Sequence, residues 1–175
     1  MRAYWENGPA DVSLNAICQQ AGVSKPSVYR EFGNDDGLTH AALSIYADKV
    51  LGKMLAITQS DDSFARKLNQ LAHLSAEDVL HEHGCLFVKM RTAKAQMGPK
   101  TQELIEAIEG MSLDAFSQVL AQARAAGSWP SGISVELGAR YLQSQIGLAL
   151  DQRARGEDPK ETLALALSVF RNADT

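Results

Sequence analysis

Residues 12–32 most constrain how this chain can fold, because they read as two short helices with matching start signals on either side of a tight turn. Ser13 and Ser24 are residues of the kind that cap a helix N-terminus through the side-chain oxygen. An apolar residue precedes each cap and another follows where a hydrophobic staple would meet it. Gly22 supplies the turn, and Pro26 stands in the first turn of the second helix, where its missing N–H does no harm. The segment therefore predicts a helix-turn-helix.

The second predicted helix carries chemistry suited to DNA on its outward side. If Val28 and Phe32 are the buried pair at i and i+4, the outward residues are Lys25, Ser27, Tyr29 and Arg30. Lysine and arginine donate to guanine edges or phosphates, and serine and tyrosine hydroxyls bond phosphate oxygens. A two-helix corner in an ordinary helical protein would show the same caps and spacing. The spacing alone leaves both interpretations open.

The charge balance argues partly against DNA binding. The formal net charge is -4, and the first fifty residues hold four cations against six acids. A chain of this charge has no global attraction for a polyanion, but DNA responds to the local charge of the contact face. We therefore expect this chain to bind DNA of unrelated sequence only weakly.

Composition and missing motifs exclude several classes of protein. Hydrophobic residues make up 45% of the 175 residues, which excludes wholesale disorder. No apolar run is long enough to cross a bilayer and no signal peptide is evident, so we expect a cytoplasmic protein without a membrane partner. The two cysteines do not indicate a disulfide framework. No zinc, nucleophile-elbow or phosphate-loop motif occurs, so we expect neither an enzyme nor a cofactor.

The run from His81 to Cys85 brings two histidines and a cysteine, residues typical of metal ligands, close together in the sequence. Residues at i and i+2 of a helix point about 200° apart, so His81 and His83 cannot share an ion on a helix. A helix C-terminus with histidines near its free carbonyls is the commoner explanation. We expect no metal site.

The rest of the chain reads as further helices. Apolar spacing and glycine or proline stops predict helices over about 34–55, 62–79, 85–97, 101–126, 134–155 and 159–172. The helix over 62–79 would bury a stripe that includes Val79, and the helix over 101–126 a stripe that includes Met111. No strand-like alternation is present. The sequence therefore predicts an all-α fold.

The order of residues from Leu14 to Phe32, followed by Gly33 to Leu38 and a long apolar helix, closely resembles the N-terminal signature of TetR-type bacterial transcriptional repressors. The segment Trp5–Gly8 resembles the end of that family's first helix. Beyond about Val50 the resemblance rests on architecture, apart from Gly84-Cys85-Leu86. It implies a helix-turn-helix DNA-binding domain over residues 1–48 and a helical effector-binding and dimerisation domain over residues 49–175.

The resemblance also implies a function and a set of contacts. The expected protein is a homodimeric, sequence-specific repressor of a palindromic duplex operator, released by a small organic effector. Lys25 and Pro26 would approach base edges, Ser27 bases or phosphates, and Tyr29 and Arg30 the DNA backbone. Ser13 and Ser24 would serve as caps and as candidate phosphate contacts.

Candidates for the effector pocket and the dimer interface lie further along the chain. Possible pocket residues are Phe87, Met90, Arg91, Met111, Phe116 and Gln145, although methionines and aromatics at helical spacing usually form plain core. The last two predicted helices carry enough apolar residues to bury two faces each, as in a four-helix interface between subunits. The candidates there are Tyr141, Gln145, Leu163, Leu167 and Phe170, and the alternative is that both helices pack inward.

Two departures from the family pattern favour a second interpretation. Glu31, Asp35 and Asp36 stand where acids would repel phosphates, and only Met1 to Asn7 remain of the family's first helix. A first helix this short would leave the helix-turn-helix less firmly held. The alternative function is a dimeric helical ligand-binding or interaction protein with an impaired DNA-reading head.

Overall fold

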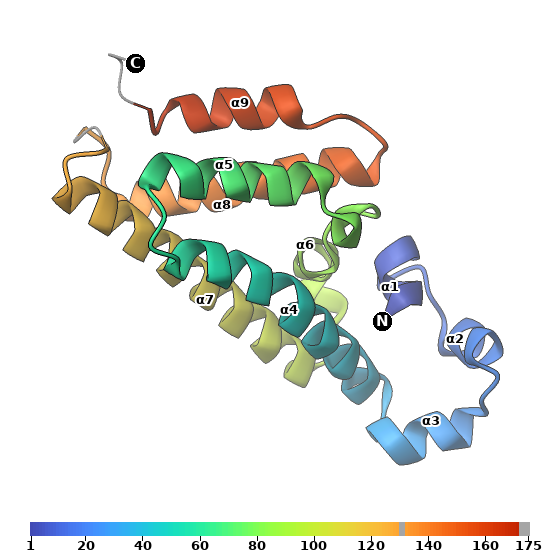
Figure 1. Ribbon diagram of the computed structural model, residues 1–175. Helices are drawn as coiled ribbons and strands as arrows, with labels where there is room; N and C mark the ends of the chain where they lie inside the picture. The colour runs from blue at the N-terminus through green and yellow to red at the C-terminus, as the bar shows by residue number, and fades with distance from the viewer. Residues whose placement is uncertain (130–131, 172–175) are drawn as a thin grey trace. The chain divides into compact units, whose positions relative to one another are not determined.

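The computed structural model describes residues 1–129 and 132–171, which form helices joined by short connections (Figure 1). No strand occurs in these residues, which confirms the all-α prediction. None of their helices is long and apolar enough to cross a membrane. The helices are α1 (Arg2–Asn7), α2 (Leu14–Ala21), α3 (Lys25–Phe32), α4 (Asp35–Gln59), α5 (Phe64–Glu77), α6 (Leu86–Thr92), α7 (Pro99–Ala125), α8 (Val135–Ala154) and α9 (Lys160–Ser168), with short 3₁₀ turns at Val79–His81 and Lys94–Gln96.

The chain forms two compact units, each made of two segments. The first unit comprises Met1–Val50 and Cys85–Glu109, and the second comprises Leu51–Gly84 and Gly110–Thr175. The domain division expected after residue 48 stays a prediction. Residues 85–109 group with the N-terminal helices, because α6 packs on α1 and the start of α7 bonds to the start of α4.

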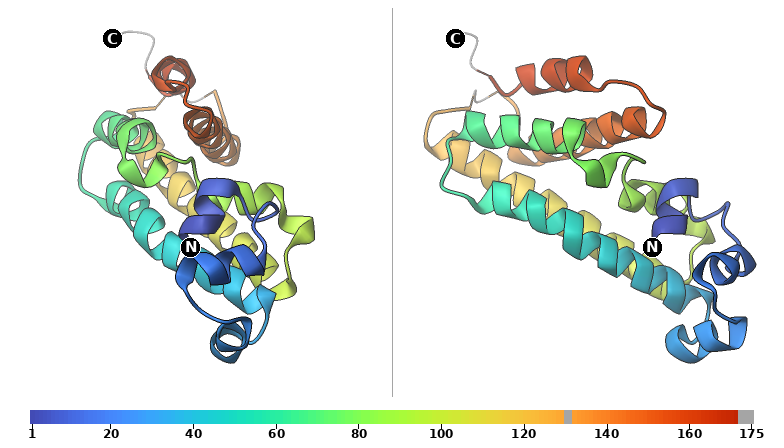
Figure 2. Two further views of the ribbon diagram at one scale, coloured as in Figure 1. Left: turned by 90° about the vertical axis from the view of Figure 1, so that its right-hand side faces the viewer. Right: turned by 45° about the vertical axis from the view of Figure 1, so that its right-hand side comes forward.

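The second unit has an aromatic core. Helices α5, α8 and α9 lie side by side and contact one another (Figure 2). Phe170 is 1% exposed, and its ring lies 5.9 Å from that of Trp129, 5.9 Å from that of Tyr141 and 6.4 Å from that of Phe64. The buried side chains around it are Leu68, Leu71, Phe116, Leu120, Ala123, Ala139, Leu142 and Leu167. These side chains form the hydrophobic core of the unit.

Two apolar residues lie outside the stripes predicted for them. Val79 is 73% exposed, because α5 ends at Glu77 and the chain continues as a 3₁₀ turn. Met111 is 46% exposed, because α7 buries Ile108, Ser112 and Ala115, and Met111 is rotated about 100° from Ser112. The last predicted helix runs to about residue 172, but α9 ends at Ser168 and the described residues 169–171 after it are not helical.

Candidate nucleic-acid interface

Helices α2 and α3 begin at the two serines that the sequence indicates. The Ser13 side chain accepts a hydrogen bond from the Ala16 N–H at 3.2 Å, and the Ser24 side chain accepts one from the Ser27 N–H at 3.3 Å. Gly22 ends α2 with φ 66°, a left-handed conformation that glycine adopts at low cost. The helix-turn-helix prediction is confirmed in both caps and in the turn.

Few side chains hold α3 in place. Val28 is its one buried residue, as predicted. Phe32, the predicted partner of Val28, is instead 37% exposed, because α3 ends there and Gly33 turns the chain with φ 81°. Most of the surface of α3 is therefore accessible.

The accessible surface of α3 carries the residues predicted to contact DNA. Lys25, Pro26, Tyr29 and Arg30 are exposed, and Ser27 is half-buried with its hydroxyl 2.9 Å from that of Ser24. Within residues 1–129 and 132–171, Lys25 and Arg30 form no ion pair with an acid. The structure thus presents two unneutralised cations and a row of hydroxyl groups on one short helix.

The acids expected to repel phosphates are not all directed to solvent. Asp36 is half-buried, and its carboxylate accepts hydrogen bonds from the backbone N–H groups of Lys100 and Thr101, both at 3.0 Å. Burial raises the pKa of Asp36, but these hydrogen bonds and one from the Thr101 hydroxyl outweigh it and leave the pKa below the usual value. Asp36 therefore stays charged and faces α7, which corrects the sequence interpretation of this residue.

Asp35 has a local partner on α3. Its carboxylate accepts a hydrogen bond from the Tyr29 hydroxyl at 3.2 Å. Burial and this bond raise the pKa of Tyr29, so the hydroxyl keeps its proton at neutral pH. The bond links α3 to the first turn of α4, while Glu31 stays exposed without such a role.

Helix α1 is short but anchored in the first unit. The Lys89 ammonium of α6 donates to the backbone carbonyl of Trp5 at 2.7 Å, near the C-terminal end of α1, where a cation is favourable. Tyr4 is buried, and the Trp5 ring lies 6.3 Å from that of Tyr46 on α4. These contacts hold the first helix despite its six residues.

The residues predicted for the dimer interface lie partly in the core. Leu163, Leu167 and Phe170 are only 3%, 3% and 1% exposed within the chain itself, so they offer little surface to a second copy. Tyr141 and Gln145 are half-buried. The exposed apolar residues on α8 and α9 are Leu137, Leu148 and Leu165, and the exposed Val169 follows α9 directly. The dimer interface stays a prediction.

The residues predicted for the effector pocket are divided between the two units. Phe87, Met90 and Arg91 belong to the first unit, and Met111, Phe116 and Gln145 to the second. Phe87, Met90 and Phe116 are buried, whereas Met111 is 46% exposed. The effector pocket stays a prediction.

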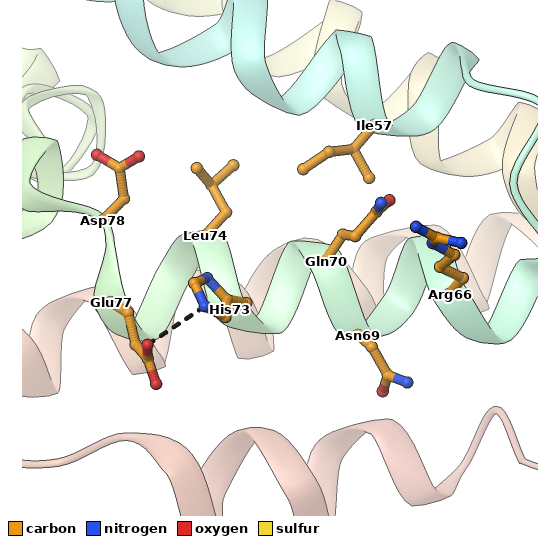
Figure 3. Close-up of a pocket in the computed structure, with 8 residues that line it drawn as sticks. All are labelled: Ile57, Arg66, Asn69, Gln70, His73, Leu74, Glu77 and Asp78. Carbon is orange, nitrogen blue, oxygen red and sulfur yellow. Dashed lines mark ion pairs between the residues drawn. The ribbon is translucent and has the colours of Figure 1, made fainter.

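Two hollows of the described surface each lie within one unit. A groove of about 490 Å³ in the second unit runs along α5 opposite Ile57, with Gln70 and Leu74 among its lining residues and Asn69 pointing away from Ile57 (Figure 3). A smaller hollow of about 290 Å³ in the first unit is lined by residues of α1, α2, α4 and the segment before α7. Neither is lined by a predicted effector residue.

The histidine and cysteine cluster has a structural explanation. His81 is buried with Nδ1 3.0 Å from the Leu74 carbonyl of α5, and burial lowers its pKa. Cys85 and Cys18 are free and buried, and burial raises the pKa of the Cys85 thiol. In the described part of the chain, no three histidine, cysteine or acidic side chains are grouped so that they could hold a metal ion.

A capped pair of short helices, with the second helix exposed and basic, defines the helix-turn-helix class of DNA-binding proteins. Residues 1–42 match the family model of the bacterial regulatory proteins of the tetR family. The HTH-type transcriptional repressor ComR of Escherichia coli K12 is 24% identical over 98% of this chain and 83% of its own length. These findings support a TetR-family transcriptional regulator, with the family match lying in residues 1–42.

Solved structures share the whole fold. A TetR-family regulator from Agrobacterium tumefaciens superimposes with a TM-score of 0.83 at 15% identity, over 97% of this chain and 92% of that one. A cysteine-substituted form of the TetR-family regulator CifR, complexed with a 26-base-pair operator, superimposes with a TM-score of 0.72 at 20% identity, over 95% of this chain and 88% of the other. At these identities the likeness establishes the fold.

Proposed function

We propose that this chain is a homodimeric repressor that reads a palindromic operator with α3 and is released by a small organic effector. The observation that carries the proposal is the accessible face of α3, where Lys25 and Arg30 are exposed and pair with no acid among the residues that the structure describes. The relative ComR is named as a repressor, and CifR is seen on operator DNA. Since a repressor acts at the chromosome, the proposal implies a cytoplasmic location and no catalytic role.

The side chains of α3 divide by the kind of contact they can make. Lys25 and Pro26 lie in the first turn, the part of a recognition helix that enters the major groove, so they are proposed to meet base edges. Ser27 is proposed to reach bases or phosphates. Tyr29 and Arg30 follow in the next turn and are proposed to hold the DNA backbone, with Ser13 and Ser24 as phosphate contacts besides their caps.

Dimerisation is proposed to use the exposed apolar residues of α8 and α9. Leu137 is 60% exposed, Leu148 44% and Leu165 75%, and exposed leucines on neighbouring helices are typical of an interaction surface. A twofold dimer would place two α3 helices on half-sites one or more DNA turns apart. The same symmetry would make the operator palindromic.

The effector is the least constrained part of the proposal. Among the candidate lining residues of the first unit, Phe87 and Met90 are buried, and an apolar lining favours an organic molecule over a phosphate or a sugar. The half-buried Arg91 guanidinium lies 5.6 Å from the centre of the Phe87 ring, so this part of α6 offers both a cation and an apolar surface.

The test is selection of bound duplexes from a random pool, at low and at physiological salt, followed by sequencing. An enriched palindrome would support the proposal and give the half-site spacing. Absence of enrichment at both salts would favour the alternative, a dimeric ligand-binding or interaction protein with an impaired reading head. Adding candidate organic molecules to the selected complex would then test release.

Substitutions on α3 test the proposed contact face. Arg30→Ala should weaken binding to all duplexes about equally and lower the slope of log affinity against log salt by about 1, because one phosphate contact is lost. Lys25→Ala should change sequence preference instead. Arg66→Ala, which removes an exposed arginine of the second unit, is the matched control. Unchanged binding in both α3 variants would contradict the contact face.

A further inference from the structure

The first turn of α7 is capped from a distant part of the chain. Gly98, the residue before α7, has no side chain to satisfy the free N–H groups of the helix. Asp36 of α4, 64 residues away from Lys100, accepts the N–H groups of Lys100 and Thr101 instead. The Thr101 hydroxyl also donates to the Asp36 carboxylate at 2.7 Å, and its side chain is 0% exposed. One carboxylate thus joins two helices of the first unit through three hydrogen bonds.

The chain leaves room for this carboxylate at one glycine. A Cβ atom on Gly98 would lie 2.3 Å from the Asp36 Cγ and 2.5 Å from its Cβ. The backbone of Gly98 is not in the left-handed region, so another residue could adopt its conformation. Close approach of Asp36 is therefore the reason that glycine fits here.

The first turn of α4 is also tied to the recognition helix. Only Gly33 and Asn34 separate α3 from α4. The Asn34 side chain accepts the N–H of Gly37 at 2.8 Å, and the Tyr29 hydroxyl of α3 donates to Asp35. Because this connection is short and bonded on both sides, the direction of the first turn of α4 sets the direction of α3.

We propose that Asp36 is a positioning residue for operator binding, because its carboxylate fixes the first turn of α4 against the first turn of α7 and thereby fixes the direction of α3. The proposal rests on the proposed function, since positioning matters only if α3 reads DNA. Asp36 itself touches no DNA in this account. Thr39 supports the contact between α4 and α7, because its hydroxyl lies 2.8 Å from the Thr101 hydroxyl.

Two substitutions break the connection from opposite sides. Asp36→Ala removes the acceptor, and Gly98→Ala leaves Asp36 in place but displaces its carboxylate. Asp35→Ala is the control for the first, because Asp35 lies one residue away and bonds only within α3 and α4. Gly110→Ala is the control for the second, because a Cβ there meets nothing within 4 Å.

The first measurement is amide hydrogen exchange of the full chain without DNA. We expect exchange at Lys100 and Thr101 to rise about tenfold or more in Asp36→Ala and Gly98→Ala and to stay unchanged in both controls. Unchanged exchange in both test variants would overturn the connection itself. This readout does not depend on DNA binding, so it remains informative if the selection of duplexes fails.

The second measurement uses the selected operator and versions with the half-site spacing changed by one base pair. We expect the two test variants to bind the operator about tenfold more weakly, to keep the salt slope, and to lose the preference for the correct spacing. A lower salt slope in Asp36→Ala and Gly98→Ala would mean that phosphate contacts are lost and would overturn the proposal. If amide exchange rises but the variants keep the preference for the correct half-site spacing, Asp36 is only a helix cap. That outcome would also overturn the proposal.

Discussion

Helices α2–α3 and α8–α9 are both pairs of consecutive helices, but they are held in place by different means. Each helix of the first pair buries one residue, Cys18 in α2 and Val28 in α3. Helix α8 buries six residues and α9 three. The first pair is therefore placed mainly by serine caps and a glycine turn, and the second by core packing. A pair placed by caps leaves most of its surface available for a ligand as large as DNA.

The largest effect on stability is expected from a substitution in the aromatic core against which α8 and α9 pack. Phe170→Ala should lower the free energy of unfolding by about 3–5 kcal/mol, because a buried ring is replaced by a cavity among Phe64, Trp129 and Tyr141. Urea denaturation at a fixed protein concentration measures it. The neighbouring Val169→Ala is the control, since Val169 is 37% exposed and should cost far less. Equal losses in the two variants would contradict the burial described for Phe170.

The outer face of the same pair should govern self-association. Leu165→Glu should weaken the dimer about tenfold or more and leave the monomer folded, because Leu165 is 75% exposed in the single chain. Sedimentation across a range of concentrations measures the dissociation constant. Val79→Glu changes another highly exposed apolar residue outside α8 and α9 and should leave association unchanged. If Leu165→Glu dimerises like the unchanged chain, the interface lies elsewhere.

The sequence predicted the first helix pair well because its signals are local. Ser13, Gly22 and Ser24 each act within three or four residues, so spacing along the chain is enough to place them. The same reasoning found Val28 buried but was wrong about Phe32, because exposure at the end of α3 depends on what the rest of the fold covers. Local rules set helix ends more reliably than they set the depth of a side chain.

The hydrogen bonds between distant parts of the chain could not be predicted from the sequence. Asp36 follows Asp35 in an acidic pair that reads as an exposed helix start, and Gly98 precedes Pro99 like an ordinary stop. Nothing in the spacing of these residues indicates that Asp36 caps α7, the helix that begins after Gly98. The Lys89 bond to the Trp5 carbonyl was missed for the same reason. Pairing across more than sixty residues is a property of tertiary packing.

A lost cap should matter more in the first pair than in the second. Ser24→Ala and Ser134→Ala each remove one side-chain acceptor at a helix start, a change that costs about 1 kcal/mol. In α3 the loss should raise amide exchange throughout the helix, because only Val28 is buried there to oppose opening. In α8 the rise in amide exchange should be confined to the first turn. Exchange measured by mass spectrometry or NMR distinguishes the two, and a loss confined to the first turn in both helices would contradict the comparison.

The smallest effect concerns the acid dependence of the contact between α4 and α7. The pKa of Asp36 is lowered from its usual 3.8, because the hydrogen bonds from Thr101 and Lys100 favour the charged form more than burial disfavours it. A carboxyl with a lowered pKa stabilises the folded state above its unfolded pKa, and this contribution fades as pH falls through the folded pKa. The stability difference between the unchanged chain and Asp36→Asn should therefore be constant at neutral pH and shrink only below 3.8.

Thermal unfolding across an acid series measures that difference. Asp35→Asn is the matched control, because it removes the neighbouring charge without touching α7 and should leave the protection of the Lys100 and Thr101 amides at each pH equal to that in the unchanged chain. A difference between the unchanged chain and Asp36→Asn that grew as pH fell would mean that the protonated carboxyl makes the contact. In that case the hydrogen bonds from the α7 backbone to a charged carboxylate would not be what holds the first turn of α4 behind the recognition helix.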